Sequence, residues 1–197
     1  MPDRHSPTHL SVIITTYNSP DALEKVLLGY ALQTDTNFEV LVADDGSDQS
    51  TADVIERFRQ SSDLSIYHVW HRDDGFRKCE ILNRAIEAAN GDYLIFTDGD
   101  CIPRRDFVEV HRHEAEPGRF LSGTYNTVPE SFGELITHQA IESGEAFDLS
   151  WLRRHGLPWS RKCLRLIRQP AVRSILNSMT TTRSTWNGCN ASGWKSD

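Results

Sequence analysis

The sequence predicts an α/β fold with a mainly parallel, twisted sheet flanked by helices. Apolar runs with strand character alternate with segments whose apolar residues recur at helical spacing. This alternation is typical of parallel strands joined by right-handed helical crossovers. A polar cluster follows each apolar run. The length of 197 residues suits one domain, with room for an appended segment.

The first half of the sheet is expected from two continuous apolar runs. Residues 10–16 and 38–43 have the composition of strands covered on both faces. Between them, residues 17–21 supply a capping side chain, a proline and an acid in the order that starts a helix. A second helix is expected after the second strand, capped by Ser50 or Thr51.

The same alternation continues to residue 114. A third strand is expected over residues 64–70, followed by a helix over 79–89 that Asn90 and Gly91 close. The fourth strand, residues 93–97, precedes a helix over 107–114. His111 and His113 lie in that helix, and their i, i+2 spacing places them on different faces, so they are not expected to share a metal ion.

Polar clusters follow all four expected strands. Ligands of open parallel sheets bind beyond the carboxyl ends of the strands, so these clusters are expected to converge on one edge. Neither glycine pattern of a dinucleotide site or a phosphate loop occurs. The clusters are Thr15–Asn18, Asp44–Asp48, Asp73–Lys78 and Asp98–Asp100.

Two carboxylates one residue apart, Asp98 and Asp100, end the fourth strand. Like charges at close range repel each other, so such a pair favours a position where a cation lies between or beside them. Mg²⁺ and Mn²⁺ take oxygen ligands and share them with phosphates, which predicts a metal–diphosphate site. An ordinary turn is the structural alternative, because aspartate and glycine both favour turns.

Together these segments resemble the family 2 glycosyltransferases of the GT-A fold. The similarity covers about residues 10–110. The segments are Val12–Asn18, Gln33–Thr34, Phe38–Ser47, Asp74–Lys78, Leu82–Ile86 and Gly91–Asp100.

The resemblance implies a nucleotide-sugar site with Mn²⁺ or Mg²⁺ as cofactor. Thr15 and Tyr17 would frame the nucleotide base, and Asp45, of the adjacent pair Asp44 and Asp45, would accept a hydrogen bond from the uracil edge. Asp98 would bind the ribose or the metal shell, and Asp100 would ligate the metal. The list of proposed nucleotide-sugar ligands is Thr15, Tyr17, Asp45, Arg77 and Asp98, with Lys78 as an alternative to Arg77 for offsetting phosphate charge.

A later segment, Trp186–Lys195, resembles the sequence that precedes the catalytic base in galactosyltransferase-like and chondroitin-polymerase-like members of the family. It implies an acceptor-side or donor-sugar role for Asn190 and Trp194. An inverting transfer needs a general base for the acceptor hydroxyl. In the resembled proteins that base follows this segment, so it is expected beyond Asp197 and the chain is expected to be truncated.

The charge distribution divides the chain. The net charge is −7, yet residues 151–197 hold nine Lys or Arg and a single acid. Residues 151–173 are basic and contain tryptophan, so they are expected to contact an anionic membrane surface, an anionic acceptor or the acidic body of the chain. The acidic body argues against nucleic acid as a partner.

The organisation predicted on this basis is a nucleotide-sugar-binding half, residues 1–110, and an acceptor-side half, residues 111–197. No apolar run approaches the length of a membrane span, and the start lacks a signal-peptide core. A cytoplasmic location is therefore expected, peripheral to the membrane if the basic segment binds it. The four scattered cysteines indicate neither a zinc site nor a disulfide framework.

The function expected is metal-dependent, inverting transfer of a sugar from a UDP-sugar to a glycan or lipid-linked acceptor, in surface polysaccharide synthesis. Two alternatives stay open. One is a nucleotide-sugar-binding fragment without turnover, because no general base is evident. The other is a nucleotidyltransferase, which also has an α/β sheet and acidic metal ligands, although its glycine-rich phosphate loop is absent after the first strand.

Overall fold

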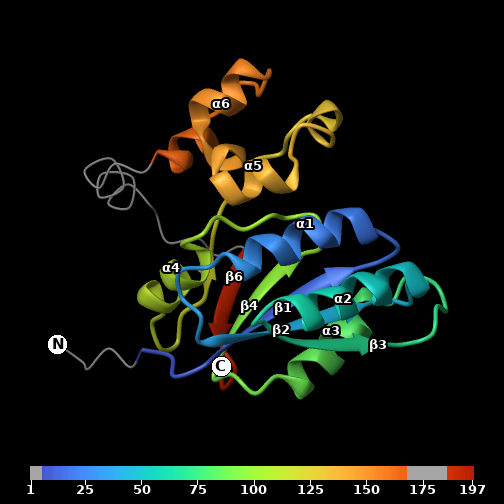
Figure 1. Ribbon diagram of the computed structural model, residues 1–197. Coiled ribbons are helices and arrows are strands. Elements are labelled where there is room, and N and C mark those ends of the chain that lie inside the picture. Colours follow the sequence, from blue (N-terminus) through green and yellow to red (C-terminus); the bar gives the residue numbers. More distant parts are fainter. Residues whose placement is uncertain (1–5, 168–185) are drawn as a thin grey trace. The chain divides into compact units, whose positions relative to one another are not determined.

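Six strands form one sheet in the order β3-β2-β1-β4-β6-β5 (Figure 1). The computed structural model describes residues 6–167 and 186–197. Strands β1 to β4 are parallel, whereas β6 runs antiparallel to both of its neighbours. The predicted α/β fold with a mainly parallel sheet is confirmed. The strands are β1 (Leu10–Thr16), β2 (Phe38–Asp44), β3 (Ser65–Trp70), β4 (Tyr93–Asp98), β5 (Leu121–Ser122) and β6 (Ala191–Trp194).

The helices that connect the parallel strands lie where the apolar spacing predicts them. The α-helices are α1 (Pro20–Ala31), α2 (Gln49–Ser61), α3 (Lys78–Ala88), α4 (Phe107–Glu114), α5 (His138–Ser143) and α6 (Leu149–Arg154). Short 3₁₀ turns cover Glu130–Phe132, Glu145–Phe147 and Arg161–Leu166.

Helices cover both faces of the parallel strands. All seven residues of β1 and all seven of β2 are buried, as expected for central strands. Alternate side chains such as Val12 and Ile14 pack with apolar residues of α1, α2 and α4. Ile13, which points the other way, packs with Ile81 and Ala85 of α3. The continuous apolar runs therefore reflect burial on two faces.

The strand register aligns the polar ends of the parallel strands. Thr15 of β1 lies opposite Asp98 of β4, and Thr16 lies opposite Asp44 of β2. Because the strands are parallel, the residues that follow each of them leave the sheet at the same edge. This edge carries the candidate site described below.

The start of α2 differs from the prediction. Asp48, and neither Ser50 nor Thr51, is the N-cap residue, and its carboxylate accepts a hydrogen bond from the Ser50 amide at 3.1 Å. Thr51 is fully buried inside the first turn. An aspartate cap also places negative charge at the positive end of the helix, which favours it over the neighbouring hydroxyls.

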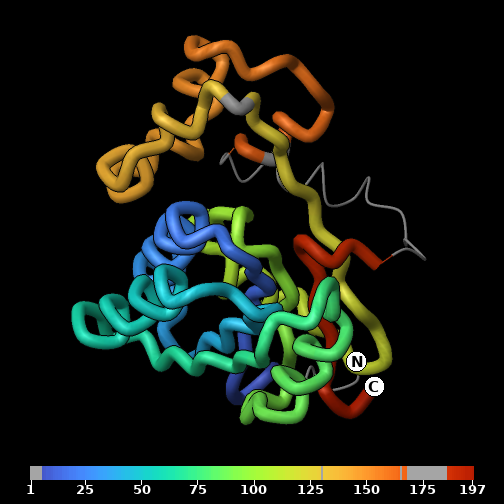
Figure 2. Tube along the Cα trace, turned by 90° about the vertical axis from the view of Figure 1, so that its right-hand side faces the viewer, coloured from blue at the N-terminus to red at the C-terminus, as the bar shows by residue number. Residues whose placement is uncertain are grey.

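The C-terminal segment returns to the sheet. β6 lies between β4 and β5, so residues near 190 sit beside residues near 96 and 122 (Figure 2). Phe96 pairs with Ala191 and Tyr93 with Trp194. The residues that precede β6 therefore lie at the carboxyl end of β4, and its last residue lies at the opposite end.

The chain forms two compact units. One comprises Met1–Ser122 together with Trp186–Asp197, and the other comprises Gly123–Thr185. β5 and β6 extend the sheet on the far side of β4. The functional boundary expected near residue 110 stays a prediction. Within the second unit, Thr137 caps α5 and Asp148 caps α6 through their side chains.

Candidate functional site

A pocket of about 350 Å³ opens at the carboxyl edge of the sheet. It is formed by the loops that follow β1, β2, β3 and β4, which confirms that polar clusters from all four converge on one place. Both apolar and polar side chains contribute to its walls. The lining residues are Thr15, Thr16, Tyr17, Ser19, Ala43, Asp45, Gly75, Phe76, Lys78, Ile81, Asp98, Gly99 and Asp100.

Tyr17 forms a wall of the pocket. Its side chain is half exposed, and its hydroxyl donates a hydrogen bond to Asp73 Oδ2 at 3.0 Å. That bond and the nearby carboxylate charge raise the pKa of Tyr17. The following residue, Asn18, has a φ of 46° and accepts a hydrogen bond from the Asp48 amide. The tyrosine side chain is thus held through its hydroxyl, and its half-exposed aromatic ring lines the pocket. An aromatic ring in this position suits stacking with a planar ligand.

Asp45 is buried but reaches the pocket. Its Oδ1 lies 2.8 Å from His71 Nε2, and its Oδ2 accepts a hydrogen bond from the Arg77 amide at 3.0 Å. An ionised carboxylate has about four acceptor positions, so these two contacts leave capacity for a ligand. Asp45 is therefore oriented by the protein and still able to accept a hydrogen bond.

Asp44 has a structural role. It is fully buried, with Oδ1 accepting from the Ser47 amide and Oδ2 lying 2.8 Å from His68 Nε2. Burial opposes its ionisation, but the hydrogen bonds from His68 and Ser47 outweigh burial and hold the pKa of Asp44 below its usual range. Of the two adjacent acids, Asp45 is the one that faces the pocket.

Asp98 accepts hydrogen bonds from side chains of three other segments of the chain. Its Oδ1 accepts hydrogen bonds from Thr15 Oγ1 at 2.7 Å and from Lys78 Nζ at 2.6 Å. Burial alone would raise the pKa of Asp98, but hydrogen bonds from Cys189, Lys78 and Thr15 hold it below its usual range. The carboxylate is therefore ionised, and part of its charge is already balanced by lysine.

Asp100 is the exposed acid of the pair. It lines the pocket, and the Cys101 thiol donates to its Oδ1 at 3.5 Å. Carboxylate oxygens that remain open to solvent suit Mg²⁺ or Mn²⁺, which combine one or two protein carboxylates with phosphate oxygens. The carboxylate oxygens at this turn fit a hard cation held mainly by Asp100, and Asp98 lies two residues before it in the same turn.

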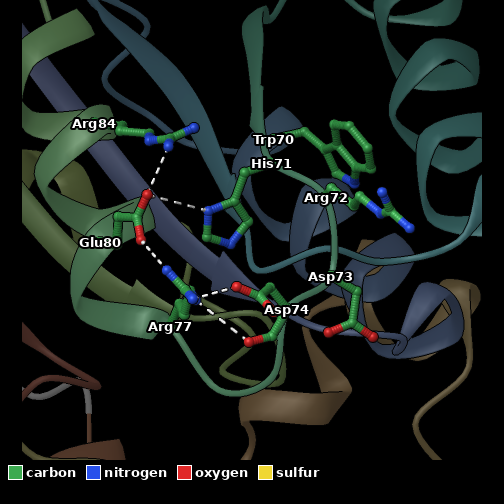
Figure 3. Close-up of a pocket in the computed structure, with 8 residues that line it drawn as sticks. All are labelled: Trp70, His71, Arg72, Asp73, Asp74, Arg77, Glu80 and Arg84. Atoms are coloured by element: carbon green, nitrogen blue, oxygen red, sulfur yellow. Dashed lines mark hydrogen bonds and ion pairs between the residues drawn. The ribbon is translucent and has the colours of Figure 1, made fainter.

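Arg77 and Lys78 point to different places. The Lys78 ammonium faces the pocket and Asp98. The Arg77 guanidinium instead pairs with Asp74 and with Glu80 Oε2, in a neighbouring pocket of about 680 Å³ (Figure 3). Lys78, the alternative to Arg77 for offsetting phosphate charge, is thus the one that lines the first pocket, whereas Arg77 contacts Asp45 through its backbone amide.

The second pocket is lined by ionic side chains that largely pair with one another. Glu80 lies between Arg77 and Arg84, and Arg84 Nη2 is 2.6 Å from Glu80 Oε1 (Figure 3). Trp70 is half exposed and donates its indole N–H to Ser47 O at 3.1 Å. This network holds the loop between β3 and α3, and Lys78 of the first pocket is the first residue of the helix that follows this loop.

The residues expected on the acceptor side are separated by β6. Asn190 precedes the strand, near the carboxyl end of β4, and its Oδ1 lies 3.0 Å from His111 Nε2. Trp194 lies at the other end, with its ring 5.4 Å from that of Tyr93 and packed against the core. Because β6 runs antiparallel to β4, Trp194 lies at the opposite end of β4 from Asn190, and its expected acceptor-side or donor-sugar role stays a prediction.

His111 links α4 to this strand. It is buried, and its two ring nitrogens lie 2.6 Å from Ser192 Oγ and 3.0 Å from Asn190 Oδ1. Burial lowers the pKa of His111 to about 4. The neutral imidazole bridges two polar side chains of the C-terminal segment, whereas His113 is exposed.

Two cysteines lie beside the acidic turn, which the sequence did not indicate. The Asp98 carboxylate and the Sγ atoms of Cys101 and Cys189 all lie within 4.8 Å of one another. Burial raises the pKa of the Cys101 thiol, and burial together with the hydrogen bond to Asp98 raises that of Cys189. Cys101 follows the acidic pair directly, but 87 residues lie between it and Cys189. The two cysteines come together because the chain returns to the sheet at β6.

The basic segment 151–173 lies partly outside the described residues, which end at 167 in this region. The described part contains the last turn of α6, where the Trp151 ring lies 4.2 Å from that of His155, and a 3₁₀ turn. Trp159 is exposed. Among the described residues, no helix combines the length and the apolar character required to span a bilayer.

A family model described as glycosyl transferase family 2 matches residues 11–175. The chain belongs to this family. The match covers the whole candidate pocket and most of the second unit, and it argues against the nucleotidyltransferase alternative. The GT-A fold expected from the sequence is likewise confirmed, because the solved structures that resemble this glycosyltransferase-family chain have that fold.

Several curated relatives are similar over part of their length. An uncharacterised glycosyltransferase of Bacillus subtilis, YfnE, is 35% identical over 119 residues, which is 58% of this chain and 29% of the relative. Chondroitin synthase of Pasteurella multocida is 28% identical over 172 residues, which is 74% of this chain and 17% of the synthase. The chain thus spans less than a third of either relative.

Two solved glycosyltransferases share the fold. The mannosyltransferase of Pyrobaculum calidifontis, solved with GDP-mannose and Mn²⁺, has a TM-score of 0.53 and 24% identity, over 69% of this chain and 40% of its own. Glucosyl-3-phosphoglycerate synthase of Mycobacterium tuberculosis, solved with UDP, has a TM-score of 0.52 and 16% identity, over 96% of this chain and 57% of its own. At these identities the likeness concerns the fold.

Proposed function

We propose that the protein transfers a sugar from a UDP-sugar to a glycan or lipid-linked acceptor, with Mn²⁺ or Mg²⁺ as cofactor. The observation that carries the proposal is the pocket of about 350 Å³, which combines an aromatic wall, a buried hydrogen-bond acceptor, a lysine and two aspartates. Each of these groups matches one part of a nucleoside diphosphate. Membership of glycosyl transferase family 2 supports the same reaction class.

The base and the ribose would occupy the inner part of the pocket. The Tyr17 ring is held by Asp73 and offers a face for stacking. Uracil presents an N–H donor on its edge, which the free acceptor positions of Asp45 can receive. Thr15 Oγ1 lies 2.7 Å from Asp98 Oδ1. The hydroxyl groups of a ribose beside them would find an acceptor in the Asp98 carboxylate and a donor in the Thr15 hydroxyl.

The diphosphate would lie toward the acidic turn. The Lys78 ammonium and a divalent cation on Asp100 would share its negative charge. When bound, the cation acts as a Lewis acid that stabilises the departing nucleoside diphosphate. Lys78 is already held in the pocket by Asp98, so it can meet a phosphate group with little loss of side-chain freedom.

Similarity to known proteins supports the proposed donor and acceptor classes. The two solved neighbours contained UDP or GDP-mannose, and one contained Mn²⁺, which supports a nucleotide-sugar donor. Relatives named as chondroitin or hyaluronan synthases support a growing glycan as acceptor and a role in surface polysaccharide synthesis. Asn190, at the carboxyl end of β4, is the described residue that we place nearest to the transferred sugar.

Calorimetric titration of UDP, with and without Mn²⁺, tests the donor site. We expect binding that Mn²⁺ strengthens, and Asp100→Ala to abolish the Mn²⁺ effect. Asp63→Ala, which removes an exposed acid from the loop before β3, is the matched control and should behave as wild type. GDP titrated in parallel reports base selectivity.

Binding of UDP that ignores both the cation and Asp100 would contradict the proposed metal site. Product analysis then separates the reaction classes. Release of UDP from a UDP-sugar with a glycan acceptor accompanies glycosyl transfer. Release of pyrophosphate would contradict the proposal, and UDP binding without any release would identify a binding fragment.

A further inference from the structure

We propose that Asp98, Cys101 and Cys189 form a site for a thiophilic divalent cation such as Zn²⁺ or Cd²⁺. One carboxylate oxygen and two sulfur atoms lie within 4.8 Å of one another. They come from two separate segments, the end of β4 with the turn that follows it and the residues before β6, which the sheet brings together. This site differs in chemistry from the oxygen-rich site proposed for Asp100, because two of its ligand atoms are sulfur.

The spacing suits a tetrahedral ion. With Zn–S bonds of about 2.3 Å and a Zn–O bond of about 2.0–2.2 Å, the ligand atoms of a tetrahedral site are roughly 3.3–3.8 Å apart. A separation within 4.8 Å reaches that geometry through small side-chain rotations. Asp100, whose Oδ1 lies 3.5 Å from Cys101 Sγ, is adjacent to the fourth position, where water is the alternative ligand.

The backbone holds both cysteines in tight turns. The Cys101 amide donates to Asp98 O at 3.0 Å, which fixes the relation between two of the ligands. On the other segment, the Cys189 amide donates to Asn187 Oδ1 at 3.3 Å and the Asn190 amide donates to Asn187 O at 3.0 Å. Because both turns are already formed, ion binding requires little ordering of the chain.

The charges also balance. One carboxylate and two thiolates carry −3, and a divalent cation with the Lys78 ammonium, which lies 2.6 Å from Asp98 Oδ1, carries +3. Both cysteines are free thiols, each partly exposed, so an ion can reach them. Binding replaces two S–H bonds with two metal–sulfur bonds and releases two protons to solvent, without any change of oxidation state.

The site shares Asp98 with the nucleotide-sugar pocket. An ion on Asp98, Cys101 and Cys189 would share that carboxylate with Thr15 and Lys78 and would compete with a ribose for it. Thiophilic cations are therefore expected to weaken UDP binding, a consequence that rests on the proposed function. The binding of the ion itself does not rest on it, so the two proposals can fail separately.

Cadmium titration of the fully reduced chain, in oxygen-free buffer, tests the site directly. Thiolate-to-cadmium charge transfer gives an ultraviolet absorption band that reports sulfur ligation without any enzymatic readout. We expect saturation at one Cd²⁺ per chain, displacement by Zn²⁺, and no displacement by a hundredfold excess of Mg²⁺. Cys101→Ser and Cys189→Ser should each lower the affinity at least tenfold, and Asp98→Asn should lower it while leaving the band in place.

Cys79→Ser is the matched control, because Cys79 is an exposed thiol at the start of α3 and lies outside the cluster. It should bind Cd²⁺ as wild type does. Circular dichroism checks that each variant is folded, and if Cys101→Ser is unfolded the other two variants carry the test. An unchanged band in Cys189→Ser, or a loss in Cys79→Ser, would overturn the proposal.

Discussion

Replacing Gly46 with alanine tests how closely the loops after β2 and β3 must approach each other. Gly46 has a φ of 96°, in the left-handed region that disfavours a side chain. A Cβ at this position would lie 2.6 Å from Asp73 Cα and 2.7 Å from Asp73 N. Those atoms are backbone, so the loop carrying Asp73 must move to make room.

The expected loss of stability has two parts. The left-handed conformation costs about 1–2 kcal/mol for a residue with a Cβ, and forcing a methyl group against backbone costs roughly 1–3 kcal/mol more. Gly118→Ala is the matched control, because Gly118 has a φ of 70° but nothing within 4 Å of its Cβ position. Gly46→Ala should therefore be the less stable of the two by about 1–3 kcal/mol.

Urea unfolding, followed by tryptophan fluorescence, measures this difference. For a chain of this length, about 1–3 kcal/mol corresponds to a melting temperature roughly 2–12 °C lower. Gly46→Ala should also weaken UDP binding, because Asp73 holds the Tyr17 hydroxyl. Equal stability of the two variants, with unchanged UDP affinity, would refute the reasoning.

Three further outcomes concern single titratable side chains. Burial lowers the pKa of His111 to about 4 from 6.5, so between these pH values the unfolded chain binds a proton that the folded chain does not. The free energy of unfolding should therefore rise with pH across that window by up to about 3 kcal/mol. Urea midpoints measured from pH 4 to 7 should depend less steeply on pH in His111→Gln than in wild type. Burial alone would raise the pKa of Glu39, but hydrogen bonds from Asn90 and Ser11 hold it below its usual range. The ionised Glu39 therefore stabilises the fold above the pKa that it has in the unfolded chain, and this stabilisation is lost as the pH falls through its lower pKa in the folded chain. Glu39→Gln should remove this part of the loss of stability in acid, and an unchanged pH dependence of stability below the usual glutamate pKa would contradict the reasoning. Asp45→Asn should weaken UDP binding, measured by calorimetry, roughly tenfold or more, because a charge-assisted hydrogen bond to the base is lost. CDP binding should be less affected, because cytosine has no ring N–H at the position that contacts Asp45 in uracil. An equal loss of affinity for both nucleotides would argue against the base contact.

The parallel part of the fold was predictable because its strands are buried on both faces. Continuous apolar runs that alternate with apolar residues at helical spacing leave few folds other than a parallel α/β sheet. Parallel pairing of the strands then places the loops that follow them at one edge of the sheet. That single topological step accounts for the convergence of Tyr17, Asp45 and Asp98 on one pocket. These residues are near their strands in sequence, so local pattern sufficed.

The C-terminal strand was not predictable in the same way. Ala191–Trp194 has little β-branched or alternating character, and its pairing with β4 depends on contacts more than ninety residues apart in the chain. The antiparallel direction decides that Asn190 lies near the site and Trp194 does not. Likewise, the choice between Arg77 and Lys78 depends on which acids surround each side chain, which neighbouring residue types alone do not specify.

The spacing of the two acids after β4 has a packing reason as well as a chemical one. The Gly99 amide donates to Thr15 O at 2.7 Å, and a Cβ on Gly99 would lie only 2.9 Å from that oxygen and 3.1 Å from Thr16 Cβ. Glycine therefore lets the turn stay against β1 while Asp98 keeps its hydrogen bond to Thr15. An ordinary turn and a metal–diphosphate site are therefore compatible interpretations of Asp98-Gly99-Asp100. The close turn directs Asp98 toward Lys78 and leaves the exposed Asp100 in the lining of the pocket.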